Sequence, residues 1–409
     1  MNLRMAWRNL WRNPRRTLLT MTAIAFASIL LVFMLSWQFG SYDIMINASV
    51  KIHTGHFQVQ ARGYQDDKDM RRVVTDPAEI GNAIAALHGV KAVTYRANGF
   101  VLVSSRDRTY GVLAVGIDPE KEAALSTLKS IVREGNYLDG KDGGEALLGE
   151  LLAKNLRVRV GDELTVIGQG RDGSVAATVL RVKGIYSSGQ DEFDRSSIQI
   201  PLKTFQDVFY MGDAVHEVVV LADTLSGVPR LVAETGEILR RQGRDGLVVL
   251  DWKELMPGLV QAIRIDLVSG FIFYLILVIV VAFSILNTFL MATLERTREF
   301  GVLLAIGMTP GRITRLVLEE SAVMTLFGIA AGVFFGILLT AWFQEHGIVI
   351  SGATEILRQY GLPDRIHPRL SWLSATLGPL CVLVITLLAA LYPALRVRRL
   401  RPVDAMAAP

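Results

Sequence analysis

A glycine-rich turn has the spacing of a nucleotide-binding motif. Gly168, Gly170 and Gly173 fit the pattern G-x-G-x-x-G and follow a strand-like run. In dinucleotide-binding folds these glycines lead into a helix whose N-terminus holds the pyrophosphate, but residues 174–186 are rich in β-branched side chains and favour a strand. Ser174 also stands where a P-loop needs its phosphate-binding lysine. The motif therefore predicts a turn between two strands, with no nucleotide chemistry on this chain.

Two histidines are the second candidates for chemistry. His53 and His56 have a spacing found in metal sites, and Asp66, Asp67 and Asp69 follow them. A zinc site needs at least three protein ligands, and no third histidine or cysteine is near in the sequence. The sequence also has no G-x-S-x-G elbow and no H-E-x-x-H motif. We therefore predict no catalytic residue, no metal site and no enzyme activity of the chain's own.

The composition places a large part of the chain in a membrane. Of its 409 residues 51% are hydrophobic, although 20% are charged, so the two kinds of residue must be segregated. Four apolar windows of about 20 residues are each long enough to cross about 30 Å of hydrocarbon as a helix. None contains Asp, Glu, Lys, Arg or His, which argues against a polar conduction path. The windows are Thr17–Phe39, Phe271–Leu290, Ala322–Phe343 and Leu373–Leu391.

Arginines at the flanks of the windows indicate the orientation. Cytoplasmic flanks of membrane helices are enriched in Lys and Arg, so both termini are expected in the cytoplasm and residues 40–266 outside it. The net charge of +4 is explained by these basic residues at the membrane flanks, so no nucleic-acid partner is expected. The first window is too long for the apolar part of a signal peptide, and residues 36–39 at its end offer no small-x-small cleavage site, so it is expected to be an uncleaved anchor. The flanking arginines are Arg4, Arg8, Arg12, Arg15 and Arg16 before the first window, and Arg396, Arg398, Arg399 and Arg401 after the last.

The outer region reads as an α+β domain. Strand-like runs cover residues 56–60, 99–104, 111–116, 163–167, 176–186 and 197–200. Helical runs cover residues 77–87, with Asp76 as the N-cap, 228–242 and 253–266. The stretch 136–201 is mostly β, and at the opposite end of the chain residues 1–16 predict a basic amphipathic helix along the inner membrane face.

The inner loop is the most informative part of the sequence. Its charged start, from Glu295, should extend the second membrane helix, and Gly307 and Pro310 close a short helix and turn. The apolar side chains of this short helix belong to no membrane window, so they should dock on lipid headgroups or on a cytoplasmic partner. These side chains are Val302, Leu303, Leu304 and Ile306.

Three glycines in the third window are spaced four residues apart. Gly328, Gly332 and Gly336 form a small-xxx-small face that lets another helix approach closely. Simple flexibility of a lipid-facing helix is the alternative explanation.

Three separated motifs carry a resemblance to a known family. Residues 6–10 with 15–17, residues 295–308, and residues 392–396 with 401–402 resemble the start, the coupling segment and the C-terminal signature of FtsX/MacB/LolC-LolE permeases. These are subunits of type VII, or mechanotransmission, ABC transporters. Residues 54–58 and 161–162 are most similar to the LolC/LolE lipoprotein-releasing group.

The resemblance implies an α-helical membrane protein with four transmembrane helices and a large α+β periplasmic domain between the first and second. A porter part would comprise residues 40–135 and 202–266, and a β-rich Sabre part residues 136–201. The expected order is an amphipathic helix at 1–16, helices at 17–39, 267–294, 321–343 and 373–393, a coupling segment at 295–320, a periplasmic loop at 344–372 and a cytoplasmic tail at 394–409.

The resemblance also implies partners. A separate LolD-like ATPase would use ATP and Mg²⁺, which this chain does not bind, and a second permease, identical or homologous, would complete an inner-membrane dimer. Lipoproteins would be the cargo. LolC has a longer, proline-containing hook that recruits a carrier, and the short turn Gly168–Gly173 here argues against recruitment by that route.

Site residues follow from the resemblance as expectations. The ATPase-coupling residues would be Glu295, Arg296, Arg298, Glu299, Gly301, Leu304, Ala305, Gly307, Met308 and Pro310. The cargo cavity would be lined by Phe33, Met34, Trp37, Phe271 and Phe273.

Two other functions remain open at this point. A MacB-like efflux subunit would work with a periplasmic adaptor, although MacB fuses its ATPase to the permease and no Walker motif occurs here. An FtsX-like relay would activate a cell-wall hydrolase, although the outer domain is larger than that role requires.

Overall fold

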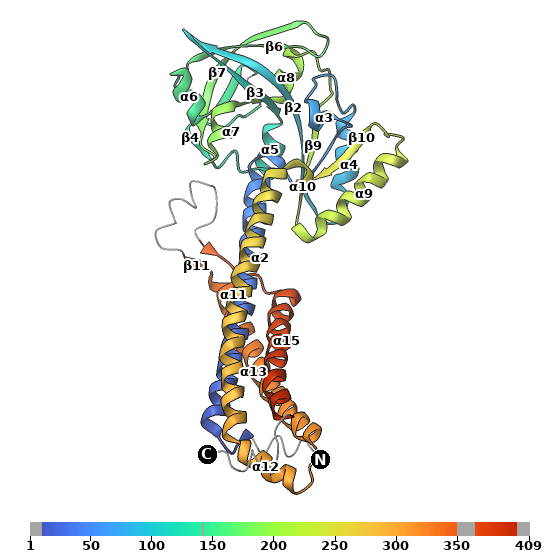
Figure 1. The fold of residues 1–409 in the computed structure, drawn as a ribbon. Helices are drawn as coiled ribbons and strands as arrows, with labels where there is room; N and C mark the ends of the chain where they lie inside the picture. Colours follow the sequence, from blue (N-terminus) through green and yellow to red (C-terminus); the bar gives the residue numbers. More distant parts are fainter. Residues whose placement is uncertain (1–9, 141–142, 350–364, 399–409) are drawn as a thin grey trace. The chain divides into compact units, whose positions relative to one another are not determined.

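The computed structural model describes residues 10–140, 143–349 and 365–398 (Figure 1). It divides into a helical unit, residues 1–42, 263–349 and 365–409, and an outer unit, residues 43–262 and 350–364. Most of the predicted amphipathic helix, together with Arg399, Arg401 and Pro402, lies outside the described residues.

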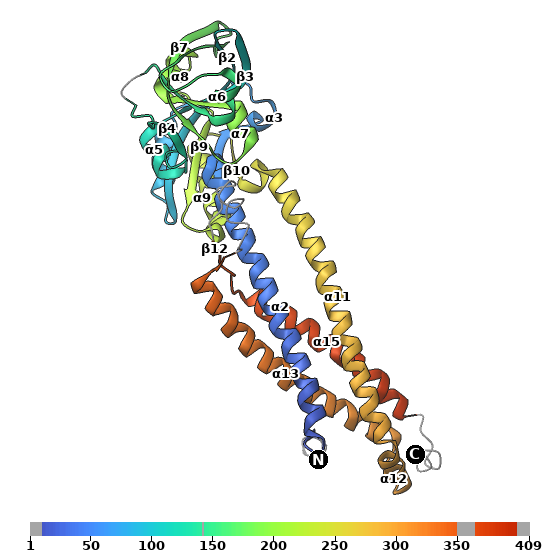
Figure 2. The ribbon, with the colours of Figure 1, turned by 90° about the vertical axis from the view of Figure 1, so that its left-hand side faces the viewer.

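Four long helices contain the four apolar windows. In the described part of the chain they are the helices long and apolar enough to cross a membrane. Side chains such as Ile24, Val278 and Val382 form one apolar cluster, and Ile329 of α13 packs against it, so that all four helices meet there. Figure 2 shows the helices as elongated rods. They are α2 (Pro14–Ser49), α11 (Pro257–Glu295), α13 (Pro310–His346) and α15 (Trp372–Val397).

The glycine face of α13 lies against α2. A Cβ atom added to Gly332 would lie 2.5 Å from the Cβ of Ser28 and 2.6 Å from the carbonyl oxygen of Ala25. Gly328 and Gly336 approach α2 in the same way, one turn to either side. Hydrogen atoms at these three positions let the two backbones come within a distance that a side chain would prevent.

The outer unit is built on one ten-stranded sheet. Its strand order is β10-β1-β9-β2-β3-β8-β5-β7-β4, and β6 pairs with both β2 and β7. Two pairs, β3 with β8 and β5 with β7, are parallel, and the others are antiparallel. The strands are β1 (Phe57–Ala61), β2 (Val90–Ser105), β3 (Arg108–Ile117), β4 (Val132–Gly135), β5 (Glu145–Gly149), β6 (Glu163–Gln169), β7 (Val175–Tyr186), β8 (Ser197–Pro201), β9 (Glu217–Ala222) and β10 (Leu247–Asp251).

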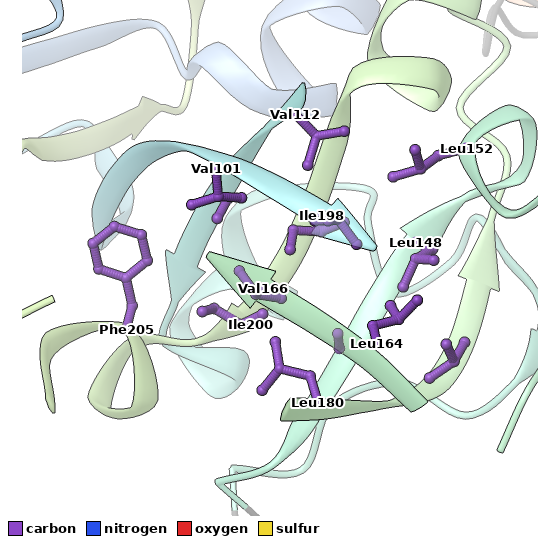
Figure 3. Close-up of a cluster of buried hydrophobic side chains, with 14 of the residues drawn as sticks. Val101, Val112, Leu148, Leu152, Leu164, Val166, Leu180, Ile198, Ile200 and Phe205 are labelled. Carbon is purple, nitrogen blue, oxygen red and sulfur yellow. The ribbon is translucent and has the colours of Figure 1, made fainter. Parts of the chain in front are cut away.

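Six of these strands close on themselves. Because β6 joins β2 to β7, the strands β2, β3, β8, β5, β7 and β6 form a closed ring of pairings. Val101, Val166, Leu180 and Ile198 point toward one another within it (Figure 3). Closure removes the sheet edges that would otherwise expose unpaired backbone groups. The strands β2 and β3, expected in the porter part, therefore also contribute to the β-rich part.

Short helices cover the sheet. They are α3 (Tyr64–Asp67), α4 (Pro77–Ala85), α5 (Pro119–Leu125), α6 (Glu150–Leu156), α7 (Asp191–Ser196), α8 (Leu202–Val208), α9 (Val228–Arg241) and α10 (Trp252–Leu255), with a π-helical turn η1 (Val50–Thr54) and a 3₁₀ turn η2 (Leu225–Gly227). In the helical unit, β11 (Ile348–Val349) and β12 (Arg365–Ile366) form a separate antiparallel pair.

Two predictions about helix ends need correction. Asp76 does not cap α4: its backbone is left-handed, with φ of 50°, and its side chain makes no capping hydrogen bond. Its carboxylate lies 3.5 Å from Arg244 instead. The helix expected at 253–266 is divided, because Asp251 caps the short helix α10 and Pro257 starts α11.

Candidate functional site

The inner loop folds as a short helix between two long ones. Helix α12 (Thr297–Ala305) follows directly on the end of α11 at Glu295. It ends at a turn in which Gly307 has φ of +102°, a conformation that favours glycine. Pro310 then occupies the first turn of α13, where its missing N–H costs nothing. The sequence thus fixes both the end of α12 and the beginning of α13.

One side of α12 packs on the membrane helices. Phe300 is buried and contacts an apolar cluster with Ile313 and Val317 of α13 and with Ala394 of α15. Leu304 lies against the same cluster. The prediction that the apolar side chains of this helix have no membrane helix to pack on is wrong for Leu303 and Leu304, because both contact this cluster. Met308, in the turn after α12, packs on it too.

The other side of α12 forms an exposed apolar tip. Ile306 is 79% exposed and Val302 is 45% exposed. Ala305, Gly307 and Pro310 are exposed beside them. We call these five residues the α12 tip. Contiguous exposed apolar surface is typical of interaction sites, which makes the tip the candidate docking surface of this loop.

The charged residues at the start of the loop form an ion network. Arg12 donates to both carboxylate oxygens of Glu299, at 2.7 and 3.1 Å. Arg296 donates to Glu299 at 3.3 Å and to Glu320 at 2.7 Å. Arg16 pairs with Glu295. We call these six residues the inner ion network, and it joins the start of α2 to α11, α12 and α13.

Glu299 is held in its charged form by this network. Partial burial raises the pKa of its carboxyl, but hydrogen bonds from Arg12 and Arg296 outweigh burial and lower the pKa below its ordinary value. The carboxylate therefore stays ionised and available to both arginines near neutral pH.

The structure divides the predicted coupling residues into three groups and one separate residue, Arg298. Ala305, Gly307 and Pro310 belong to the α12 tip, whereas Leu304 and Met308 pack on the membrane helices and Gly301 is buried. Arg298 is exposed on α12 outside the tip. Glu295, Arg296 and Glu299 belong to the inner ion network.

Sequence reasoning missed five residues of this site. Val302 and Ile306 were noted as apolar but left out of the coupling set, although their spacing of four residues places them on one helix face. Arg12 and Arg16 were interpreted as topology signals and as parts of the amphipathic helix and of the family's start motif, and Glu320 was not considered. Nothing in the sequence indicates that charged residues so far apart along the chain form ion pairs in the folded protein.

Two family models together match most of the chain. The FtsX-like permease C-terminal model matches residues 271–402, and the MacB-like periplasmic core domain model matches residues 17–237, more than half of the chain. The chain belongs to the FtsX/MacB family of ABC transporter permeases. In this permease the inner ion network, α12 and the turn at Gly307 lie largely within the FtsX-like match.

Known proteins of several functions are similar to this permease. LolC of the lipoprotein-releasing system of Neisseria meningitidis is 24% identical, and the match covers 84% of this chain and 83% of that protein. The macrolide export ATP-binding/permease protein MacB of Shewanella oneidensis is 23% identical, covering 99% of this chain and 60% of that protein. The periplasmic region of MacB from Actinobacillus actinomycetemcomitans is 17% identical, covering 52% of this chain and 94% of that one, with a TM-score of 0.37.

The predicted cargo residues of this permease fall into two separate groups. Phe33 of α2 contacts the rings of Trp37 and of Phe343 on α13. Phe271 and Phe273 are exposed on α11. Among the described residues no ring contact joins the aromatic side chains of α2 to those of α11.

The glycine-rich turn connects β6 and β7, which pair as an antiparallel hairpin, and no helix follows it. The carboxylate of Asp172 accepts hydrogen bonds from the backbone N–H and the hydroxyl of Ser174, at 2.9 and 2.6 Å. The predicted strand-to-strand turn is confirmed, and the side chain of Asp172 occupies it without leaving a phosphate cradle.

A buried ion pair joins the end of α2 to the outer sheet. Arg96 of β2 is fully buried, and its guanidinium donates to both carboxylate oxygens of Glu122 on α5, at 3.0 and 2.6 Å. Its third arm donates to the backbone carbonyl of His53 in η1, the turn that continues α2. Arg96 thus fixes three segments at one point.

Two buried histidines, His56 from the rejected metal pair and His216, serve the same sheet. His56 accepts a hydrogen bond from the N–H of Ala222 on Nδ1, and its Nε2 lies 3.3 Å from the side-chain oxygen of Asn47. His216 accepts one from the N–H of Asn98 on Nδ1, and its Nε2 lies 3.2 Å from the carbonyl of Met70. Both rings are therefore held as neutral imidazoles.

Lowering the pH from 6.5 to 4 is expected to destabilise the outer unit. Burial lowers the pKa of His56 and of His216 to about 4. Between pH 6.5 and 4 the unfolded chain therefore binds more protons than the folded chain, and the free energy of unfolding decreases as the pH is lowered. Burial raises the pKa of Glu217, which acts in the opposite direction. Unfolding of the purified protein followed against pH should show a smaller loss for His216→Gln than for the wild type. An equal loss in both would contradict the assignment to His216.

Proposed function

We propose that this permease works with a separate ATP-binding subunit to extract lipoproteins, or similarly amphipathic cargo, from the outer leaflet of the inner membrane. The observation that carries the proposal is the α12 tip, an exposed apolar surface on a helix otherwise packed against the membrane helices. The similarity to the lipoprotein-releasing protein LolC over most of both chains supports the choice of cargo.

The ATP-binding subunit would dock on the α12 tip. The tip offers Val302 and Ile306 as apolar anchors, and Arg298 beside them as a charged contact. ATP and Mg²⁺ would be bound by that LolD-like partner and not by this chain. Packing of Phe300 on α13 and α15 would carry the partner's motion into the membrane helices.

Replacing Ile306 by aspartate should prevent this docking. A carboxylate buried in an apolar contact is unpaired, and loss of a central apolar anchor costs about 2 kcal/mol or more, so at least about tenfold less ATPase should copurify. The amount of ATPase per permease, measured by mass spectrometry after purification in mild detergent, tests this. Ile306→Leu is the matched control and should keep the wild-type amount. Equal recovery with both variants would exclude the tip as the docking surface.

The remaining parts of the proposal concern assembly and cargo. Both termini would lie in the cytoplasm and the outer unit in the periplasm, following the flanking arginines. A second permease, identical or homologous, would complete a transporter with two ATPases. Amphipathic cargo would enter beside the first and second membrane helices, where Phe33, Met34, Trp37, Phe271 and Phe273 offer apolar surface.

A MacB-like efflux subunit is the second candidate. The similarity to the macrolide exporter of Shewanella oneidensis extends over 99% of this chain, which favours this alternative over the relay to a hydrolase. Recovery of a periplasmic adaptor and an outer-membrane channel with the purified permease, in place of lipoproteins, would support it.

A further inference from the structure

The inner ion network connects the start of α2 to α12, and among the described residues neither the apolar cluster around Ile24 nor the one around Phe300 contains side chains of both elements. Between the start of α2 and helices α11 to α13 lies a cavity of about 300 Å³. Arg12 and Arg16 on one side of it, and Arg296 and Glu299 on the other, contribute to its walls. Where a void separates two elements, van der Waals contact cannot hold them. At this level the connection between the start of α2 and α12 therefore runs through ionic hydrogen bonds.

The network has the geometry of a clamp. Glu299 is shared, because Arg12 approaches it from the segment before α2 while Arg296 approaches it from the junction of α11 and α12. Arg296 also reaches the buried Glu320 on α13. A single exposed ion pair contributes little to stability. A carboxylate that is shared by two arginines, one of them bound in a bidentate way, fixes the orientation of the side chains as well as their distance.

We propose that the inner ion network is a positioning clamp that makes the first membrane helix move with α12. Its charged residues act on α2 and are not part of the surface on which the ATPase docks. The inference rests on the proposed function in one respect, since the docked ATPase is the source of the motion. The clamp itself is inferred from the ion pairs described above. Without the clamp, α12 would still move α13 and α15 through Phe300, while α2 would lose its ionic connection to α12.

The pair Arg16 and Glu295 allows a clean test. Each has the other as its ion-pair partner in the structure, so reversing either charge sets two like charges face to face, and reversing both restores the attraction. The variants are Arg16→Glu, Glu295→Arg and the double variant. Arg315→Glu is the matched control, since Arg315 is itself exposed and pairs with Glu319 on α13 outside the network.

Two measurements on the full-length protein are needed. Spin labels on Arg15→Cys and Arg298→Cys, both at exposed positions, report the distance between the start of α2 and α12 in a Cys381→Ser background. The amount and the hydrolysis rate of the copurified ATPase report docking and coupling separately. The distance measurement needs no ATPase, so it decides on the clamp even if the proposed function fails because no ATPase is recovered.

The clamp predicts one pattern of results. Both single reversals broaden the distance distribution and lower ATP hydrolysis per ATPase severalfold, because two like charges in place of the ion pair push the start of α2 away from the end of α11. They leave the recovered amount of ATPase unchanged. The double reversal and Arg315→Glu behave like the wild type. An unchanged distance in the single reversals would overturn the clamp, and so would reduced recovery of the ATPase, which would assign these charges to the docking surface.

Discussion

Replacing Arg96 by methionine is expected to destabilise the outer unit by about 3–5 kcal/mol, because removal of one partner leaves a buried charge uncompensated. The carboxylate of Glu122, left without its partner, is only 2% exposed, so water cannot solvate it. The backbone carbonyl of His53 loses its donor at the same time. Hydrogen exchange of the amides of β2 and α5 in the purified full-length protein would measure the loss as faster exchange.

The controls for this prediction separate charge from volume. Lys121→Met removes a cation from α5, the helix that carries Glu122, at a position that is nearly half exposed. It should leave the hydrogen exchange of the amides of β2 and α5 unchanged. The double variant Arg96→Met and Glu122→Leu should recover much of the stability, because a buried ion pair can often be replaced by apolar side chains at little cost. Wild-type exchange in the single variant would show that Arg96 does not hold these segments together.

Replacing Gly332 by leucine should separate α2 from α13. The new Cβ would lie 2.6 Å from the backbone oxygen of Ala25, which cannot move aside as a flexible side chain could. Overpacking of this kind costs typically about 1–3 kcal/mol, and a backbone contact places the variant at the upper end. The melting temperature of the protein in detergent should fall accordingly.

The matched control is Gly311→Leu on the same helix. A Cβ at Gly311 meets no atom within 4 Å, so this variant carries the same chemical change without the clash. If both variants melt at the wild-type temperature, the close approach of the two helices does not contribute to the stability of the helical unit.

The periodic features of the fold could be predicted from the sequence. The four apolar windows coincide with α2, α11, α13 and α15, because a run without charges has no other stable location. Most strands were found too, since alternation and β-branched residues are local signals. The end of α12 was predictable because Gly307 and Pro310 each have a conformation that only one kind of turn accommodates.

Features that depend on distant contacts could not be predicted. The closed ring of strands depends on β6 pairing with β2, more than 50 residues away in the sequence, and nothing local in Glu163–Gln169 specifies that partner. Asp76 has the right residue type and spacing for an N-cap, but its contact with Arg244 comes from another helix end. The inner ion network was hidden for the same reason, because Arg12 and Glu299 are 287 residues apart.

The most direct test of the account is to purify the tagged full-length protein in mild detergent from its native host and identify by mass spectrometry what remains bound. We predict a small ATP-binding protein together with lipoproteins. If an ATP-binding protein is recovered with an adaptor or a hydrolase instead of lipoproteins, the assignment as a permease stands, but the proposed cargo is wrong. Absence of any ATP-binding protein would contradict the claim that this chain works as the permease subunit of a transporter with a separate ATPase.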